Sequence, residues 1–145
     1  LIKAFKIVIE KNPKFRLYLL GDDVIGLKQD LLELVKNLKL ESSIFFKGFI
    51  ENPYSYYKYS DLFVLSSRWE GLPNTVLENL YLEKPIVVTD CIKYLSDLII
   101  DGENGFIVPV NDYKILGEKI LNYSKLKPKN TYVPTDINKL FNKYI

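Results

Sequence analysis

The sequence has 145 residues, about the length of one domain; 48% of them are hydrophobic, 26% are charged, and the formal net charge is +2. A chain of this length can bury a core without a disulfide or a structural metal, and its nearly balanced charge gives no reason to expect a nucleic-acid partner. Histidine is absent, which excludes histidine general bases, histidine metal ligands and Ser-His-Asp triads from this chain.

Five short apolar runs predict the strands. The runs do not alternate apolar with polar residues, and continuous runs of this length are typical of strands buried on both faces of a parallel sheet. In chain order they cover residues 17–20, 44–46, 62–65, 86–88 and 106–108.

The segments between these runs predict helices. The clearest has an apolar stripe at helical spacing, formed by Leu27, Leu31, Leu34, Val35 and Leu38. Two more helices are expected over 74–82 and 112–123. The sequence opens at Leu1 in what reads as the middle of another helix, so we expect a piece of a longer protein. Alternating strands and helices predict right-handed βαβ units and an α/β fold with a doubly wound parallel sheet.

The last part of the chain differs in composition. Residues 125–134 are polar and contain two prolines, which predicts a connection over the surface. A final helix is expected over 135–144. We therefore expect a folded domain over 1–122, followed over 123–145 by a surface connection and a C-terminal helix.

Ligands of a doubly wound sheet bind beyond the carboxyl ends of its strands. The segment after Leu65 reads as a short turn, followed by a helix that begins near Asn74. Gly71 in that turn lets a ligand approach the main chain closely. The free N–H groups of residues 74–76 should point out of the helix start, where the helix dipole favours an anion such as a diphosphate.

Glu78 lies one turn deeper in the same helix, in an apolar stretch. A carboxylate in that setting should accept hydrogen bonds, and a ribose diol is a suitable donor. Each of these residues also has an ordinary structural role. Asn74 is more often a helix cap than a ligand contact, Glu70 reads as a solvated loop acid, and an acid such as Glu78 favours a helix N-terminus. Taken singly, the structural role is the better interpretation of each residue.

Together these residues form a longer pattern. Glu70 and Glu78 are separated by seven residues within S-S-R-W-E-G-L-P-N-T-V-L-E-N, and K-P-I-V-V follows at 84–88. This pattern closely resembles the signature of the glycosyltransferase group 1 family, which is family 4 of the retaining enzymes with the GT-B fold. Further segments resemble the same family in the same order, at residues 1–5, 19–22, 46–49 and 101–105. The resemblance covers about residues 1–122.

The resemblance implies a fold and a reaction. The chain would be the Rossmann-like, donor-binding C-terminal half of a GT-B enzyme. The reaction would transfer a hexose from a nucleoside diphosphate sugar to a hydroxyl acceptor, with retention at the anomeric carbon, in surface polysaccharide synthesis. Catalysis would rest on positioning and on stabilising the charge of the departing diphosphate. It would need no metal and no cofactor beyond the donor substrate.

The resemblance also implies roles for individual residues. Glu70 would be the catalytic residue that faces the donor sugar. The diphosphate and the ribose would be bound by Gly71, Leu72, Pro73, Asn74, Thr75 and Glu78. The base pocket would be lined by the main chain of Gly48, Phe49 and Ile50. Less central positions in the cleft would be Gly21, Arg68 and Asp97.

The sequence departs from the family pattern in several places. Asp23 replaces the second glycine of the turn after the first strand, and residues 91–97 lack the usual glycines, with Asp97 in place of the usual glutamate. The family's diphosphate-gripping arginine and lysine lie before the helix that corresponds to Leu1, and an acceptor-binding domain precedes them. We therefore expect this chain alone not to catalyse transfer, and expect the acceptor glycan or lipid-linked sugar to bind through that missing domain.

Other interpretations stay open. The chain could be a nucleotide-sugar-binding or interaction module without turnover. A related epimerase is disfavoured because epimerases of that kind use histidines, and a glycogen-synthase-like polymerase is a further alternative. A receiver-like signalling domain would need an acidic cluster after the first strand. Asp22 and Asp23 lie there, but no lysine-bearing partner turn is evident.

The sequence gives weaker indications of location. Cys91 is the only cysteine, which favours a reducing compartment and thus the cytoplasm. No apolar run approaches the roughly 18–20 residues that cross a bilayer. The lysine-rich surface permits loose peripheral contact with an anionic membrane, without an amphipathic anchor. The tyrosine-rich segment at 54–59 favours a helix packed on the sheet over a sugar-binding platform.

Overall fold

The computed structural model describes residues 1–23, 26–71 and 73–128. Strands and helices alternate along these residues, and all strand pairs are parallel. The strands are β1 (Leu17–Leu20), β2 (Ile44–Gly48), β3 (Phe63–Leu65), β4 (Ile86–Thr89) and β5 (Gly105–Val108). The predicted α/β class with parallel strands is confirmed, and each predicted strand is present with small shifts in its bounds.

The helices are α1 (Ile2–Lys11), α2 (Lys28–Asn37), α3 (Tyr54–Tyr59), α4 (Asn74–Tyr81), α5 (Leu95–Leu98) and α6 (Tyr113–Leu121), with a 3-10 turn, η1 (Tyr123–Lys125). Helix α1 starts at Ile2, next to the first residue of the sequence. Leu27 precedes α2 and is largely exposed. The tyrosine-rich segment is helical, as predicted. The helix expected over 135–144 lies outside the described residues.

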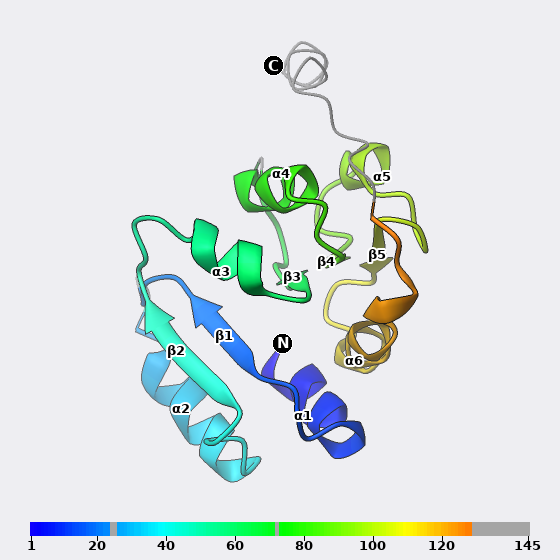
Figure 1. Ribbon diagram of the computed structural model, residues 1–145. Helices are drawn as coiled ribbons and strands as arrows, with labels where there is room; N and C mark the ends of the chain where they lie inside the picture. The colour runs from blue at the N-terminus through cyan, green and yellow to red at the C-terminus, as the bar shows by residue number, and fades with distance from the viewer. Residues whose placement is uncertain (24–25, 72, 129–145) are drawn as a thin grey trace.

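The strands fall into two hydrogen-bonded groups, β1–β2 and β3–β4–β5. Helix α1 lies between the two groups, and α2 runs along the β1–β2 pair (Figure 1). The alternation of elements predicts one continuous sheet. In the described part of the chain, the sheet is instead interrupted between β1 and β3. The edge of β1 that faces away from β2, and the edge of β3 that faces away from β4, therefore have no strand partner there.

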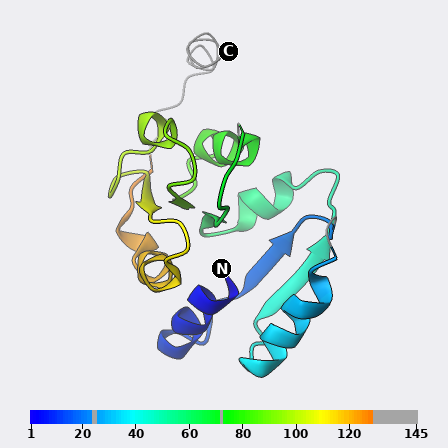
Figure 2. The same cartoon turned by 180° about the vertical axis from the view of Figure 1, so that it is seen from behind.

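Strand β4 has apolar neighbours on both faces, and all its residues are buried. Val87 belongs to the cluster formed with α1 and α6, whereas Ile86 and Val88 pack in a second cluster with α4 and α5. Successive side chains of a strand point to opposite faces, which explains this division. Viewed from behind, α4 and α5 again lie on the opposite side of β3–β5 from α1 and α6 (Figure 2). This three-stranded part is therefore doubly wound.

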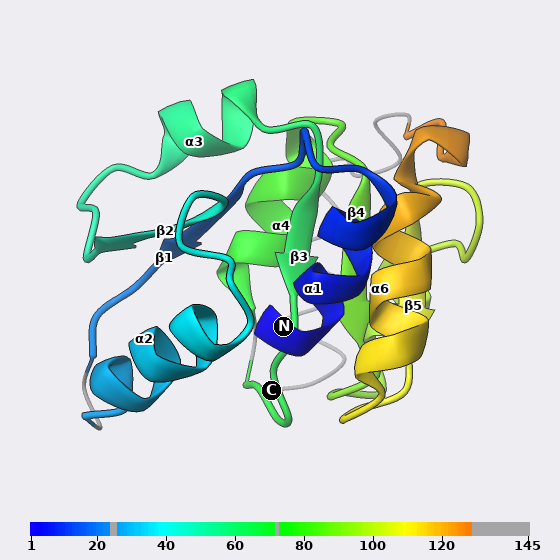
Figure 3. The ribbon, with the colours of Figure 1, turned by 90° about the horizontal axis from the view of Figure 1, so that it is seen from below.

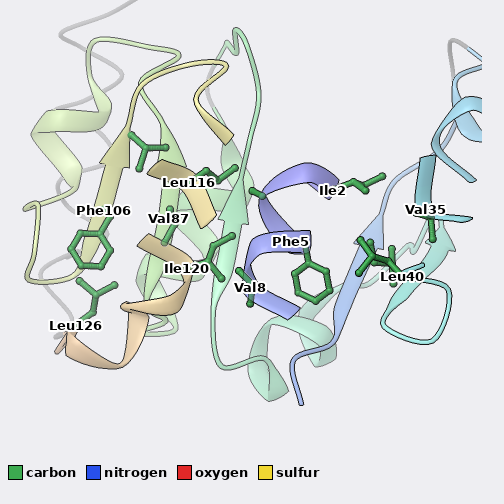
Figure 4. Close-up of a cluster of buried hydrophobic side chains, with 13 residues drawn as sticks. Ile2, Phe5, Val8, Val35, Leu40, Val87, Phe106, Leu116, Ile120 and Leu126 are labelled. Atoms are coloured by element: carbon green, nitrogen blue, oxygen red, sulfur yellow. The ribbon is translucent and has the colours of Figure 1, made fainter. Parts of the chain in front are cut away.

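Helices α1 and α6 pack closely beneath the sheet, as the view from below shows (Figure 3). Gly117 permits this approach, because a Cβ there would lie 2.9 Å from the carbonyl oxygen of Ala4. Val8 and Ile120 lie side by side between the two helices, and Phe5 points toward Leu40 (Figure 4).

The chain after η1 adds to the same cluster. Leu126 is only 6% exposed, and the N–H of Lys127 donates to the carbonyl oxygen of Glu103 at 2.8 Å. The segment that we expected to cross the surface, 125–134, therefore contains a core residue near its start. None of the helices in the described part of the chain combines the length and apolar composition that crossing a bilayer requires.

Candidate functional site

The turn after β3 carries Glu70 and Gly71 at the carboxyl end of the three-stranded sheet. The hydroxyl of Ser67 donates to Oε1 of Glu70 at 2.5 Å, and Glu70 is half-buried. This hydrogen bond fixes the orientation of the carboxylate. Because an ionised carboxylate has about four acceptor sites, Glu70 keeps the capacity to accept hydrogen bonds from the hydroxyls of a ligand.

Two side chains, one at the end of β4 and one in the segment after it, hold this turn on either side of Glu70. The hydroxyl of Thr89, the last residue of β4, donates to the carbonyl oxygen of Ser67 at 2.5 Å. The hydroxyl of Tyr94, just before α5, donates to the carbonyl oxygen of Gly71 at 2.5 Å. Main-chain groups held by buried side chains have a defined position, so the turn is tied directly to the sheet.

A third tie comes from the loop after β5. Nε of Arg68 donates to Oδ1 of Asn111 at 3.1 Å. Arg68 is exposed, so its remaining guanidinium nitrogens face solvent, and it lies two residues before Glu70. Trp69 is 81% exposed beside them. The role of Arg68 in a donor cleft stays a prediction.

Helix α4 begins directly after the turn, and its first residue is Asn74. The N-cap is Pro73 and no side chain caps the helix, so the interpretation of Asn74 as a plain helix cap was wrong. The N–H of Val76 donates to the carbonyl oxygen of Pro73 at 2.9 Å and is not free, contrary to expectation. The N–H groups of Asn74 and Thr75 have no acceptor among the residues that the structure describes.

The start of α6 shows what an internally satisfied helix end looks like in this fold. Oδ1 of Asp112 accepts from the N–H of Lys114 at 3.1 Å and from that of Ile115 at 3.0 Å. A carboxylate of the chain itself therefore occupies the place that an anion would take. The first turn of α4 contains no acidic residue and has no side-chain cap, so no carboxylate of that turn takes the corresponding place.

Glu78 lies on α4 one turn beyond Asn74, and both side chains are exposed. Residues four apart share a helix face, so the carboxylate lies on the same side as the helix start. The apolar setting expected for Glu78 was wrong, because its neighbours Val76 and Leu80 face the core instead. The hydroxyl of buried Tyr57 lies beside Glu78. Burial first, and then the charge of Glu78 and a hydrogen bond with it, raise the pKa of Tyr57.

The residues predicted for a base pocket lie at the carboxyl end of the other pair of strands. The N–H of Gly21 donates to the carbonyl oxygen of Gly48 at 2.9 Å, so these two residues are adjacent. Their φ angles of +130° and +69° favour glycine at both positions. Phe49 is 73% exposed and Ile50 is half-buried. This group ends β1 and β2, whereas Glu70 follows β3.

Two further residues were predicted to belong to the donor site. Asp97 is an exposed residue of α5 whose N–H donates to the carbonyl oxygen of Tyr94 at 3.0 Å. Leu72 lies outside the described residues. Within 1–23, 26–71 and 73–128, no group of three or more histidine, cysteine, aspartate or glutamate side chains is placed to hold a metal ion.

Cys91 follows β4 close to the turn. Burial raises the pKa of its thiol, and the nearby carboxylates of Glu70 and Asp90 act in the same direction, while hydrogen bonds oppose them. A thiol whose pKa is raised stays protonated at neutral pH and is a poor nucleophile.

Sequence reasoning missed three of the hydroxyls that order this site, those of Ser67, Thr89 and Tyr94. All three follow or end a strand of the three-stranded sheet, and the rule that ligands bind beyond the carboxyl ends of strands pointed to these segments. Which hydroxyl reaches which carbonyl depends on the path of each loop, and the sequence carries no signal for that.

Comparison with known proteins places these observations in a family. The family model described as Glycosyl transferases group 1 matches residues 1–134. An uncharacterized glycosyltransferase of Methanocaldococcus jannaschii is 47% identical over 91 residues, which are 63% of this chain and 22% of that protein. The capsular polysaccharide biosynthesis glycosyltransferase CapM of Staphylococcus aureus is 31% identical over 124 residues, 83% of this chain and 31% of CapM.

A solved structure shows the same fold. The crystal structure of Anabaena HepE in complex with UDP-glucose superposes with a TM-score of 0.73 at 26% identity. The match covers 84% of this chain and 33% of HepE. The chain thus spans between about a fifth and a third of the length of each of these three proteins.

Proposed function

The chain belongs to the group 1 glycosyl transferases, and on that premise we propose that it forms the part of a glycosyltransferase that binds the nucleoside diphosphate sugar. The arrangement of polar groups around the start of α4 carries this proposal. The N–H groups of Asn74 and Thr75 have no acceptor in the described part of the chain, Glu70 lies in the turn before them, and Glu78 follows on the same helix face.

The start of α4 is the place for the diphosphate. Two unpaired N–H groups and the positive end of the helix dipole both favour an anion there. Each hydrogen bond to a charged oxygen contributes about 1.5–3 kcal/mol. No side chain of the first turn competes for these donors, since the helix lacks a side-chain cap and an acidic residue there. Gly71 has no side chain that would keep a ligand from the main chain of the turn.

Glu78 is placed to bind the ribose. It lies one helical turn, about 5–6 Å along the axis, beyond the first N–H groups, a spacing that a ribose phosphate can bridge. Its carboxylate accepts hydrogen bonds from two neighbouring hydroxyls, and Tyr57 supports it from the core side. The base would then extend toward the main chain of Gly48, Phe49 and Ile50, with Gly21 beside them.

Glu70 is placed to contact the hexose. The hydrogen bond from Ser67 orients its carboxylate, and a sugar attached to a diphosphate at α4 projects toward the preceding turn. Arg68, two residues before Glu70, and Asp97 on α5 would be secondary contacts of the ligand. The complex of HepE with UDP-glucose supports a nucleotide sugar as the ligand class.

We propose that the reaction is transfer of the hexose to a hydroxyl, with the retention of configuration that the family resemblance implies. Main-chain donors at α4 stabilise the charge that develops on the departing diphosphate, and the protein otherwise acts by positioning. Neither role requires a metal ion or a further cofactor. The acceptor, a glycan or lipid-linked sugar, would bind through residues beyond this chain. The similarity to CapM, a capsular polysaccharide biosynthesis glycosyltransferase, supports surface polysaccharide synthesis. A cytoplasmic location would suit the reducing compartment that the single cysteine favours.

Calorimetric titration with UDP, GDP and ADP, and with their common hexose conjugates, tests the proposal. Glu78→Ala should weaken the preferred nucleotide by about 10–100-fold, because a hydrogen bond to a charged group contributes about 1.5–3 kcal/mol. The matched control is Glu118→Ala, which removes an exposed carboxylate from α6 and should leave the affinity unchanged.

Binding of one nucleotide that Glu78→Ala weakens and Glu118→Ala leaves intact supports the donor site. Equal affinities in the unmodified chain and in both variants would mean that the ligand binds elsewhere, and would overturn the proposed donor site. If the chain binds none of the nucleotides, the same titration of the complete gene product decides, and absence of binding there overturns the proposal.

A further inference from the structure

The turn that carries Glu70 and Gly71 is tied to a side chain from another part of the fold. The hydroxyl of Tyr94 donates to the carbonyl oxygen of Gly71 at 2.5 Å. Tyr94 directly precedes α5, and it is only 8% exposed. A hydroxyl enclosed in this way can move little, so the carbonyl that it contacts is held in one orientation.

The anchor of Tyr94 also supports α4. Leu95, the next residue, is fully buried in the cluster that contains Val76 and Leu80 of α4. Close-packed side chains of this kind move together and transmit displacements. The hydroxyl of Tyr94 therefore fixes the Gly71 main chain relative to the same cluster that fixes α4.

The other ties act on the opposite side of Glu70. Thr89 holds the carbonyl of Ser67, and Asn111 holds Arg68. These contacts precede Glu70 in the chain, whereas the contact of Tyr94 follows it. Among the described residues of the turn, Gly71 lies between Glu70 and the start of α4, and the hydroxyl of Tyr94 holds it there.

We propose that Tyr94 is a positioning residue of the donor site, whose hydroxyl holds the Gly71 main chain and so sets the distance between Glu70 and the start of α4. This inference rests on the proposed function. In a nucleotide sugar the hexose and the diphosphate are joined covalently, so Glu70 and the α4 donors can both be satisfied only at one separation. If the turn shifts relative to α4, the contact between Glu70 and the hexose is lost before the contacts of the diphosphate.

The protonation of Tyr94 suits it to this role. Burial raises its pKa to about 12, and negative charge on Cys91 and Glu70 acts in the same direction, so the hydroxyl keeps its proton and remains a donor under ordinary assay conditions.

The test compares Tyr94→Phe with the unmodified protein, and uses two ligands: the hexose conjugate and the free diphosphate of the nucleotide that the unmodified protein prefers. The substitution removes the hydroxyl and keeps the ring. We expect the Kd of the conjugate to rise about tenfold, the size of one lost hydrogen bond. The Kd of the free diphosphate should change much less, because it does not reach Glu70.

Two controls separate positioning from general damage. Tyr113→Phe removes an exposed hydroxyl at the start of α6 and should change neither Kd. Glu78→Ala should raise both Kd values by the same factor, since the ribose is common to both ligands. Only loss of the tether is expected to change the ratio of the two affinities.

Unchanged affinities in Tyr94→Phe, in a protein whose unmodified form binds both ligands, overturn this inference and leave the proposed function standing. If neither the unmodified chain nor the complete gene product binds either ligand, the proposed function fails and the inference with it. Should Tyr94→Phe not fold, the unmodified protein still decides by NMR. A slowly exchanging Tyr94 hydroxyl proton, coupled through the hydrogen bond to the Gly71 carbonyl carbon, supports the tether, and a rapidly exchanging one refutes it.

Discussion

Gly71→Ala should separate the stability of the fold from the function of the site. An added Cβ at Gly71 meets no atom within 4 Å, and the φ of Gly71 is not among the positive values. The free protein should therefore accept alanine without strain. Replacing glycine at such a position stabilises a protein by about 0.4–1 kcal/mol, because the unfolded chain loses conformational freedom. We expect the free energy of unfolding to stay equal or rise by that amount.

Ligand binding should respond in the opposite direction. The proposed diphosphate and hexose lie against the main chain of the turn, where the methyl group of alanine would intrude. Crowding of this kind costs about 1–3 kcal/mol, so the Kd of the nucleotide sugar should rise about 5–150-fold. Urea unfolding and calorimetric titration of the same preparation measure the two effects.

Gly117→Ala is the matched control. Its Cβ would lie 2.9 Å from the carbonyl oxygen of Ala4 and 3.2 Å from Cβ of Ile7. The gain of about 1 kcal/mol in helix propensity is offset by overpacking of about 1–3 kcal/mol. Stability should fall while the affinity of the folded protein is kept. A Gly71→Ala protein that is less stable, or that binds donor as well as the unmodified protein, would refute the reasoning.

Three further measurements test other parts of the structure. Thr89→Val leaves the carbonyl of Ser67 without its hydroxyl donor, and should lower stability by about 1–3 kcal/mol in urea unfolding; an unchanged midpoint would contradict the contact. The raised pKa of Tyr94 lies near 12 against an ordinary 10.0, so its contribution to stability is complete below pH 10 and is lost as pH rises toward 12. This alkaline loss of stability should be smaller in Tyr94→Phe. An identical alkaline unfolding profile in the two proteins would contradict the raised pKa of Tyr94. The N–H of Leu17 donates to the carbonyl oxygen of Ser43, just before β2. Because successive N–H groups of a strand point to opposite sides, we expect the N–H of Tyr18 to point to the interrupted edge. Tyr18 should exchange its amide hydrogen at least about tenfold faster, and equal protection would mean that this edge is covered.

The positions of the strands could be predicted because burial on both faces leaves a direct mark on composition. β4 shows this clearly, since its residues Ile86, Val87 and Val88 are each fully buried. Val87 faces α1 and α6, and the other two face α4 and α5. The start of α4 was also predictable, because a strand, a turn with glycine and proline, and an apolar helix follow one another in the sequence. The family pattern then gave Glu70 and Glu78 their expected roles.

Contacts between distant residues could not be predicted in the same way. The tie from Tyr94 to Gly71 spans two loops, and its geometry depends on how α5 begins. The bond from Val76 to Pro73 depends on the first turn of the helix and removes one of three expected donors. Leu126 was assigned to the surface because its neighbours are polar, yet its own side chain completes the core beside α6.

The central claim is that a nucleoside diphosphate sugar binds at the start of α4, and amide chemical-shift mapping tests it most directly. Addition of the preferred nucleotide sugar should shift the amide signals of Asn74 and Thr75 strongly, and those of Lys114 and Ile115 hardly at all, because Asp112 already satisfies them. Strong shifts at the start of α6, or none at the start of α4 in a protein that binds the ligand, would contradict the claim.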